Sequence, residues 1–130
     1  MTRRVALATL VVADYDAAIA WYTGALGFRL LEDTWLGDGK RWVVVAPQDD
    51  AGVALLLALA SGEAQAARVG DQTGGRVAFF LHTDDFARDH AAMRARGVEF
   101  LEAPRREPYG TVAVFADLYG DRWDLLERAR

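Results

Sequence analysis

An internal repeat constrains this chain more than any other feature of its sequence. When the sequence is shifted by 70 positions against itself, six of the nineteen residues from 14 to 32 match, among them Asp14 with Asp84 and Gly27 with Gly97. The same shift aligns VVVA (43–46) with AVFA (113–116), and VALLL (53–57) with WDLLE (123–127). A long period with two copies predicts a duplicated module, because solenoids need three or more short repeats.

Each copy predicts the same order of elements. An apolar run typical of a strand comes first, at 5–12 and at 77–81, and the aspartate after it, Asp14 or Asp84, is expected to cap a helix. The expected buried stripes of the two helices are Ala18, Ile19, Tyr22 and Leu26, and then Phe86 and Met93. Gly27 and Gly97 are expected to end the helices. Three strands should follow in each copy, at 28–33, 41–46 and 53–59, and at 98–103, 111–116 and 122–127.

The sequence therefore predicts an α+β chain, 1–130, that forms a single domain of two tandem β-α-β-β-β modules. Module one spans 1–60, a Gly- and Ala-rich connection spans 61–75, and module two spans 76–130. The opening MTRRVALATLVVADY has a basic pair before an apolar run, as in a signal peptide. We interpret it as the first strand instead, because a partner copy appears later in the chain.

The composition of the chain disfavours nucleic acid and membranes as binding partners. The formal net charge is −4 and no Lys/Arg cluster occurs, which disfavours nucleic acid, since its binding depends on neutralising phosphates. The chain has no cysteine, which removes disulfides and thiolate metal sites. No apolar run approaches the roughly 20 residues of a membrane span. We therefore expect a cytoplasmic protein that binds neither nucleic acid nor membrane.

Two long stretches resemble the vicinal oxygen chelate superfamily, also called the glyoxalase/bleomycin-resistance/extradiol-dioxygenase superfamily. They are VVADYDAAIAWYTGALGFRLLED (11–33) and PYGTVAVFADLYGDRWDLLE (108–127), set within paired β-α-β-β-β modules. The resemblance covers nearly the whole chain. It implies a glyoxalase-like fold whose mixed sheets curl into a cup that holds the site, and it implies a homodimer. It says little about the reaction, because a shared fold does not fix function.

The resemblance also implies where a divalent metal would be held. Asp124 stands at the position of the last family ligand, and Ala54 is its mate in the first copy. The opening ligand positions fall on Leu7 and Ala78, and a register error of one residue reaches no ligand either. A stable site needs three or four protein ligands, so we expect no metal cofactor.

Two polar side chains are the candidate catalytic or ligand-binding groups, although a catalytic role is not assigned. Asp124 lies in the middle of a strand, where it either pairs with Arg122, two residues away on the same face, or contacts a ligand. His82 either ends its strand with a local hydrogen bond or lines the pocket, where it could move a proton. The other histidine, His90, shares a stripe with Phe86 and is expected to be structural.

Aromatic residues suggest a surface for a flat molecule. Trp35 and Trp42 flank the turn LGDGKR, and Tyr109 lies at the corresponding turn of the second copy. They either pack their hairpins or stack on a ligand, while Trp123 should point to the face opposite Asp124 and enter the core. The residues expected to line the ligand site are Leu7, Thr9, Trp35, Trp42, Ala54, Leu56, Ala78, Phe80, His82, Tyr109, Arg122 and Asp124.

Three classes of function stay open at this point. The first is a metal-free protein that binds a planar, mostly apolar small molecule, of the sequestration or resistance type. The second is an enzyme, either a glyoxalase-like lyase or isomerase or a relative of the dioxygenases, with Asp124 and His82 as acid–base groups. The third is a regulatory or interaction module. The sequence does not name the ligand.

Overall fold

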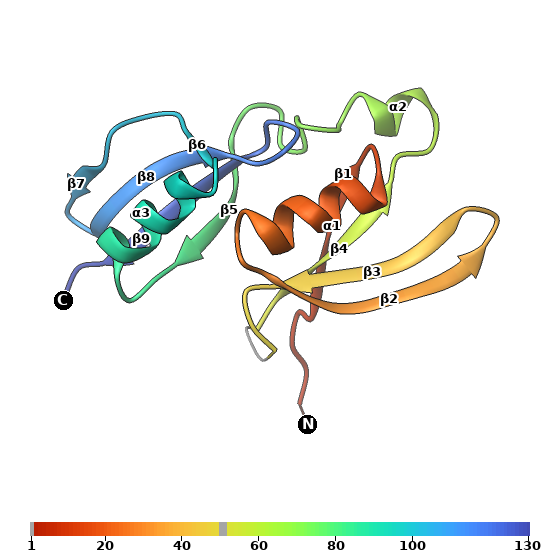
Figure 1. Cartoon of the computed structure of the whole chain (residues 1–130), viewed down its shortest axis with the longest axis horizontal. Helices are drawn as coiled ribbons and strands as arrows, with labels where there is room; N and C mark the ends of the chain where they lie inside the picture. The colour runs from red at the N-terminus through yellow and green to blue at the C-terminus, as the bar shows by residue number, and fades with distance from the viewer. Residues whose placement is uncertain (1, 50–51) are drawn as a thin grey trace. The chain divides into compact units, whose positions relative to one another are not determined.

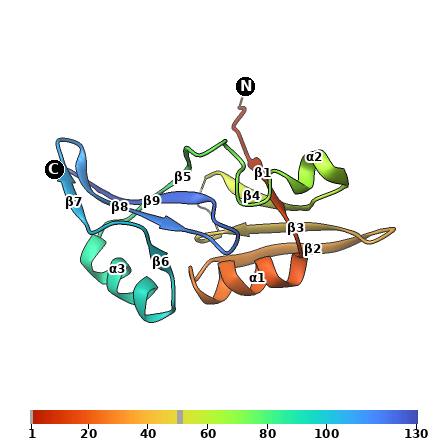
Figure 2. The same cartoon turned by 90° about the horizontal axis from the view of Figure 1, so that it is seen from above.

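The computed structural model describes residues 2–49 and 52–130. It divides the chain into two compact units, Met1–Val69 and Gly70–Arg130, and their boundary falls inside the connection predicted at 61–75. Each unit carries one mixed sheet with a helix on one face, as Figures 1 and 2 show. The α+β class with two mixed sheets confirms the predicted fold class.

The first unit contains a four-stranded sheet and two helices. Its elements are β1 (Leu7–Val12), α1 (Tyr15–Gly24), β2 (Arg29–Gly37), β3 (Lys40–Ala46), β4 (Ala54–Leu59) and α2 (Gly62–Ala66). The strand order is β1-β4-β3-β2, and β1 runs parallel to β4 while the other pairs are antiparallel. The short helix α2 lies within the predicted connection at 61–75, for which the sequence predicts no helix.

Helix α1 begins and packs as its sequence predicts. The Asp14 side chain caps it by accepting a hydrogen bond from the Ala17 N–H at 2.7 Å. Gly27 follows with φ +72°, the left-handed conformation that glycine adopts without strain. The side chain of Arg41 on β3 reaches Asp16 of α1 at 2.8 Å, so the odd-numbered residues of β3 face the helix. Val43 and Val45 are fully buried there.

The second unit repeats the plan with one extra strand. Its elements are β5 (Val77–His82), α3 (Phe86–Ala95), β6 (Glu99–Phe100), β7 (Arg105–Glu107), β8 (Gly110–Ala116) and β9 (Arg122–Arg128). The order is β5-β9-β8-β6, with β7 also paired to β8, and β5 runs parallel to β9. Each module thus places its first strand beside its last.

The predicted cap of the second helix is wrong by one residue. Asp85, and not Asp84, accepts from the Arg88 N–H, at 3.0 Å. The chain stays paired to β9 one residue beyond β5, because the Thr83 N–H donates to the Leu126 carbonyl, so the helix starts later. Asp84 instead forms an ion pair with Arg88 at 2.8 Å.

The strand predicted at 98–103 is also wrong beyond its first half. Only Glu99–Phe100 forms β6, and a separate strand, β7, covers the remaining length of β8. Pro104 lies between the two short strands, and a proline has no N–H to donate to a sheet.

An aromatic core joins α3 to its sheet. Trp123 is buried and stacks with Phe115 at 5.8 Å between ring centroids, while Phe79 lies 4.7 Å away. His90 stacks on Phe86 at 5.2 Å, in agreement with its expected structural role, and burial lowers its pKa, with a smaller contribution from the charge of Arg94. No helix among the described residues is both long enough and apolar enough to cross a membrane.

Candidate functional site

One face of the second sheet carries Asp124, and α3 covers the other. The Glu127 side chain accepts from the Phe86 N–H at 2.7 Å, which places the odd-numbered residues of β9 on the α3 side. Asp124 therefore points to the opposite side, here called the helix-free face. It lies in register with Val114 on β8 and Phe80 on β5. The helix-free face includes Phe80, His82, Arg105, Val112, Val114, Arg122, Asp124, Leu126 and Arg128.

Asp124 is a buried carboxylate without a complete set of partners. Its residue is only 7% exposed, and its Oδ1 atom has no hydrogen-bond partner among the residues the structure describes. The interpretation that it pairs with Arg122 at a solvated rim is wrong. Arg122 instead donates to the Gly75 carbonyl at 3.2 Å, because it lies at the start of β9, beside the turn that precedes β5. A buried oxygen without a hydrogen-bond partner lowers the free energy of unfolding, because it has lost its hydrogen bonds to water.

The surroundings of Asp124 favour its protonated form. Burial raises the pKa of the Asp124 carboxyl, the positive charge of Arg105 opposes that change, and the negative charge of Glu102 adds to it. The carboxyl therefore keeps its proton to a higher pH than an ordinary aspartate does. In its protonated form such a group can donate as well as accept a hydrogen bond.

A polar network that the sequence did not suggest stands beside Asp124. Arg105 on β7 donates to Glu102 at 3.0 Å and to Glu107 at 2.7 Å, and it reaches the Tyr109 hydroxyl at 3.4 Å. Glu102 also accepts from the Val114 N–H at 3.1 Å, which ties the network to β8. The stretch RREPYG (105–110) has the composition of a polar loop. Only the pairing of β7 with β8 shows that Arg105 belongs to the helix-free face.

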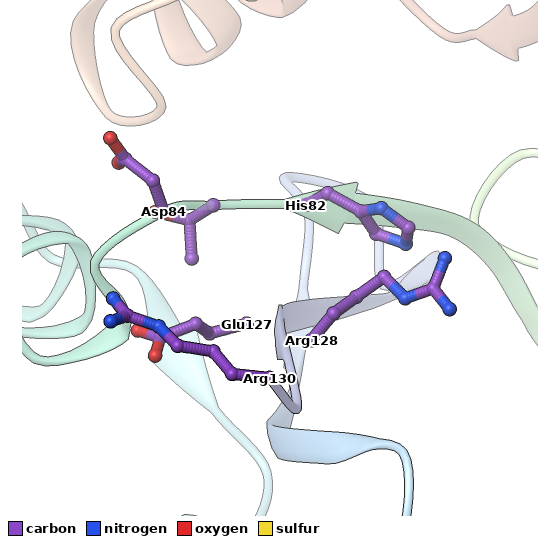
Figure 3. Close-up of a pocket in the computed structure, with 6 residues that line it drawn as sticks. His82, Asp84, Glu127, Arg128 and Arg130 are labelled. Carbon is purple, nitrogen blue, oxygen red and sulfur yellow. The ribbon is translucent and has the colours of Figure 1, made fainter.

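His82 lies on the same face, two residues beyond the partner of Asp124 on β5. It is exposed and lines an open hollow of about 430 Å³ at the end of that strand. In Figure 3 its imidazole lies beside the Arg128 guanidinium, while Arg130 extends toward the opposite side, near Glu127. Asp124 does not line this hollow. The structure thus places His82 and Asp124 on one face but in different surroundings.

Phe80, and not Ala78, lies beside Asp124. An irregularity in register between Val77 and Phe79 leaves Ala78 without a partner on β9 and interrupts the strict alternation. Phe80 is 61% exposed, which is unusual for an aromatic side chain in a strand. This face is distinguished by a solvent-exposed phenyl ring that lies next to a buried carboxyl.

The first unit has a corresponding apolar face of its own. Leu7 pairs with Ala54 and Thr9 with Leu56 between β1 and β4, and Leu7, Ala54 and Leu56 pack in one cluster with Val44. This face lies opposite α1, because Val44 alternates with the residues that contact the helix.

The two hairpin tryptophans of the first unit point to opposite faces of the β2–β3 ribbon. Trp42 pairs with Thr34, while Trp35 pairs with Arg41, the residue that contacts α1. Trp42 therefore shares the face of Val44, and its indole N–H donates to Glu32 at 2.9 Å. Trp35 is 66% exposed on the other side. Only one of the two can belong to a surface built on the apolar cluster.

The side chains at the implied metal positions do not fit a divalent metal. Leu7, Ala54 and Ala78 carry no donor atom, and Phe80, which lies beside Asp124, has none either. Within residues 2–49 and 52–130 no group of three or more His, Cys, Asp or Glu side chains is arranged to hold a metal ion. Asp124 alone cannot supply the three or four protein ligands of a stable site.

Comparisons with known proteins agree with this architecture. A family model described as "Glyoxalase/Bleomycin resistance protein/Dioxygenase superfamily" matches residues 4–125. An uncharacterized protein of Shewanella frigidimarina is 54% identical over 119 residues, which cover 91% of this chain and 88% of that protein.

Two solved structures are also similar over nearly their full length. UcmS2 has a TM-score of 0.84 at 32% identity, covering 97% of this chain and 98% of its own. TnmS3, described as an antibiotic binding protein from Streptomyces sp. CB03234, has a TM-score of 0.77 at 28% identity, covering 99% and 98%.

Proposed function

Since the chain belongs to the glyoxalase/bleomycin resistance protein/dioxygenase superfamily, we propose that it is a metal-free binding protein for a planar, mostly apolar small molecule. The ligand lies on the helix-free face of the second unit. Its flat body covers Phe80 and Val114, and a polar group meets Asp124. The role is sequestration or resistance, and the protein is a cytoplasmic homodimer.

One observation carries this proposal: a buried carboxyl with an unpartnered oxygen lies next to a solvent-exposed aromatic ring. Ligand sites combine apolar walls with a few polar groups that fix orientation. Phe80 supplies the apolar surface and Asp124 the polar group. A ligand that covers both would remove the exposed ring from water, and once the side chains above Asp124 shift to expose its Oδ1 atom, the ligand would give that oxygen its missing partner.

The relatives and the side chains at the metal positions also support metal-free binding of a small molecule. TnmS3, a structure similar over nearly the whole chain, is an antibiotic binding protein. Leu7, Ala54 and Ala78 offer no metal ligand where the resemblance implies one. Binding through shape and a few hydrogen bonds, without chelation, is the function that suits these side chains.

A second candidate function rests on the raised pKa of Asp124. A carboxyl that keeps its proton to a higher pH than an ordinary aspartate is a candidate general acid or base, as in a lyase or isomerase. His82, on the same face, would be the second proton-transfer group. Turnover of a bound small metabolite, lost in Asp124→Asn, would favour this candidate over sequestration.

The proposal is tested by fluorescence binding assays with a panel of planar metabolites and antibiotics. For any molecule that binds, Asp124→Asn should weaken binding roughly ten- to a hundredfold, the effect of losing a buried charge-assisted hydrogen bond. Phe80→Ala should weaken ligand binding as well, and His82→Ala tests whether the histidine contributes to ligand binding. The matched control is Glu63→Gln, the same change from acid to amide on α2 of the first unit.

Trp42 is tested separately, because it lies in the first unit on the face of Leu7 and Ala54. Trp42→Phe keeps an aromatic surface and Trp42→Ala removes it. If the Asp124, Phe80 and His82 variants all bind a ligand as tightly as the parent protein, the proposed site is wrong.

A further inference from the structure

The charges around Asp124 do not balance. Arg105 is the one cation of the network, and three carboxylates surround it when all are ionised: those of Glu102, Glu107 and Asp124. The immediate surroundings of Arg105 and Asp124 therefore carry a surplus of negative charge when all three carboxyls are ionised, because the other arginines of this face, Arg122 and Arg128, stand at the two ends of β9. An unbalanced charge that is partly out of water is costly, unless something of opposite sign binds there.

Arg105 is hydrogen-bonded to two other carboxylates and, in the described part of the chain, forms no hydrogen bond with Asp124, so it offsets the charge of Asp124 only in part. Its Nε donates to Glu102 at 3.0 Å, and its Nη1 donates to Glu107 at 2.7 Å and reaches Tyr109 at 3.4 Å. All three groups are contributed by the segment around β7, so the guanidinium is held in place before any ligand arrives. A ligand anion at this guanidinium would stand beside the carboxylates of Glu102 and Glu107, so the network disfavours anionic ligands.

Asp124 supplies a second and independent observation. It is more than nine-tenths buried, and among the described residues its Oδ1 atom has no hydrogen-bond partner. A donor with a positive charge would satisfy this oxygen and offset the excess charge together. No side chain of β8 can do so, because the residues of β8 that face this side are Val112 and Val114.

Phe80 adds the aromatic half of the site. It lies in register with Asp124 on the neighbouring parallel strand, so the two side chains leave the sheet roughly 5 Å apart. The ring is 61% exposed. Cations bind over aromatic faces, and flat rings stack on them. One molecule that is both aromatic and cationic would contact Phe80 and Asp124 at once.

We infer that the ligand of the helix-free face is an aromatic amine that binds as a cation, with its positive nitrogen at Asp124 and Glu102 and its ring on Phe80. This inference rests on the proposed function and adds the chemical class of the ligand. It also makes Glu102 a specificity-determining residue.

Three tricyclic probes of the same shape and different charge test the inference at pH 8. 9-Aminoacridine is a cation, acridine is neutral and acridine-9-carboxylate is an anion. We expect the cation to bind at least tenfold more tightly than acridine, and the anion to bind most weakly. Asp124→Asn and Glu102→Gln should each reduce the affinity for the cation roughly tenfold and leave that for acridine unchanged.

Glu63→Gln, an equal change of charge on α2 in the first unit, is the control and should have no effect. The thermal midpoint of each variant shows whether it is folded. If Glu102→Gln fails to fold, because Glu102 also accepts from the Val114 N–H, Asp124→Asn alone decides the test. Equal binding of acridine and 9-aminoacridine, with equal losses in Asp124→Asn, would overturn the inference and leave the proposed function intact. Failure of all three probes to bind would overturn the inference, while the panel of planar metabolites and antibiotics decides the proposed function.

Discussion

Replacing Asp121 with asparagine should stabilise the protein above neutral pH. Asp121 is 3% exposed in the turn between β8 and β9, and its Oδ1 atom accepts from the Gln72 N–H at 3.1 Å. Its Oδ2 atom is buried with no hydrogen-bond partner in the described part of the chain. The buried carboxylate of Asp117 stands nearby and accepts from the Tyr119, Gly120 and Asp121 N–H groups. Two carboxylates thus share a dry turn.

The raised pKa of Asp121 determines the size and the sign of its contribution to the free energy of unfolding. Burial, and then the negative charge of Asp117, raise the pKa of Asp121 from its ordinary value of 3.8 to about 7, although the Gln72 N–H opposes this. The folded state therefore binds the proton more tightly than the unfolded chain does. The contribution of Asp121 to stability is complete below about pH 4 and is lost as the pH rises through 7. The ceiling on this loss is about 4 kcal/mol, since each pH unit corresponds to about 1.4 kcal/mol.

Asparagine keeps an oxygen for the Gln72 N–H and turns an NH₂ group toward Asp117. We therefore expect Asp121→Asn to raise the free energy of unfolding by roughly 1–3 kcal/mol at pH 8 and to change it little at pH 4.5. Urea denaturation of both proteins across this range measures the difference, and comparing two proteins cancels the titration of His90. Asp49→Asn, on an exposed ion pair in the first unit, is the control. A difference independent of pH, or one that reverses sign, would refute the reasoning.

Three further predictions concern the turn, the metal and the assembly. Gly70→Ala should destabilise the protein by roughly 3 kcal/mol, since φ is +78° and the added methyl group would overlap the Tyr119 carbonyl. Gly74→Ala, with φ +69° and open space around the methyl group, should cost only about 1 kcal/mol. Thermal and urea unfolding of the two variants measure the difference. Elemental analysis after purification without chelators should find no stoichiometric metal, and near-stoichiometric iron, nickel, zinc or manganese that depends on Asp124 would contradict this. Light scattering at micromolar concentration should give about twice 14.3 kDa, and a mass of about 14 kDa would reject the homodimer.

The duplicated plan could be predicted from the sequence because its signals are local. Asp14 caps the first helix as predicted, and Trp123 enters the core while Asp124 takes the other face. The second cap was misplaced because two aspartates follow each other, and only the hydrogen bond from the Thr83 N–H to β9 decides between them. A local pattern gives the type of an element more reliably than its first residue.

The candidate site was harder to predict because it depends on pairing between distant strands. Arg105 belongs to the site only because β7 pairs with β8, and its sequence reads as a polar loop. The irregularity near Ala78 brings Phe80 beside Asp124, and no local signal marks it. Similarly, the register of β2 with β3 decides that Trp35 and Trp42 face opposite ways. The sequence pointed to Asp124 and Phe80 but not to Arg105 and Glu102.

The most direct test of the central claim is a methyl NMR titration with 9-aminoacridine. Val114 and Leu126 lie on the helix-free face, while Ala113 and Leu125 are their neighbours on the α3 side of the same strands. The proposed site predicts that the Val114 and Leu126 methyl resonances shift on binding, that those of Ala113 and Leu125 shift little, and that Asp124→Asn weakens the response. Shifts confined to the α3 side, or a response unchanged in Asp124→Asn, would contradict it.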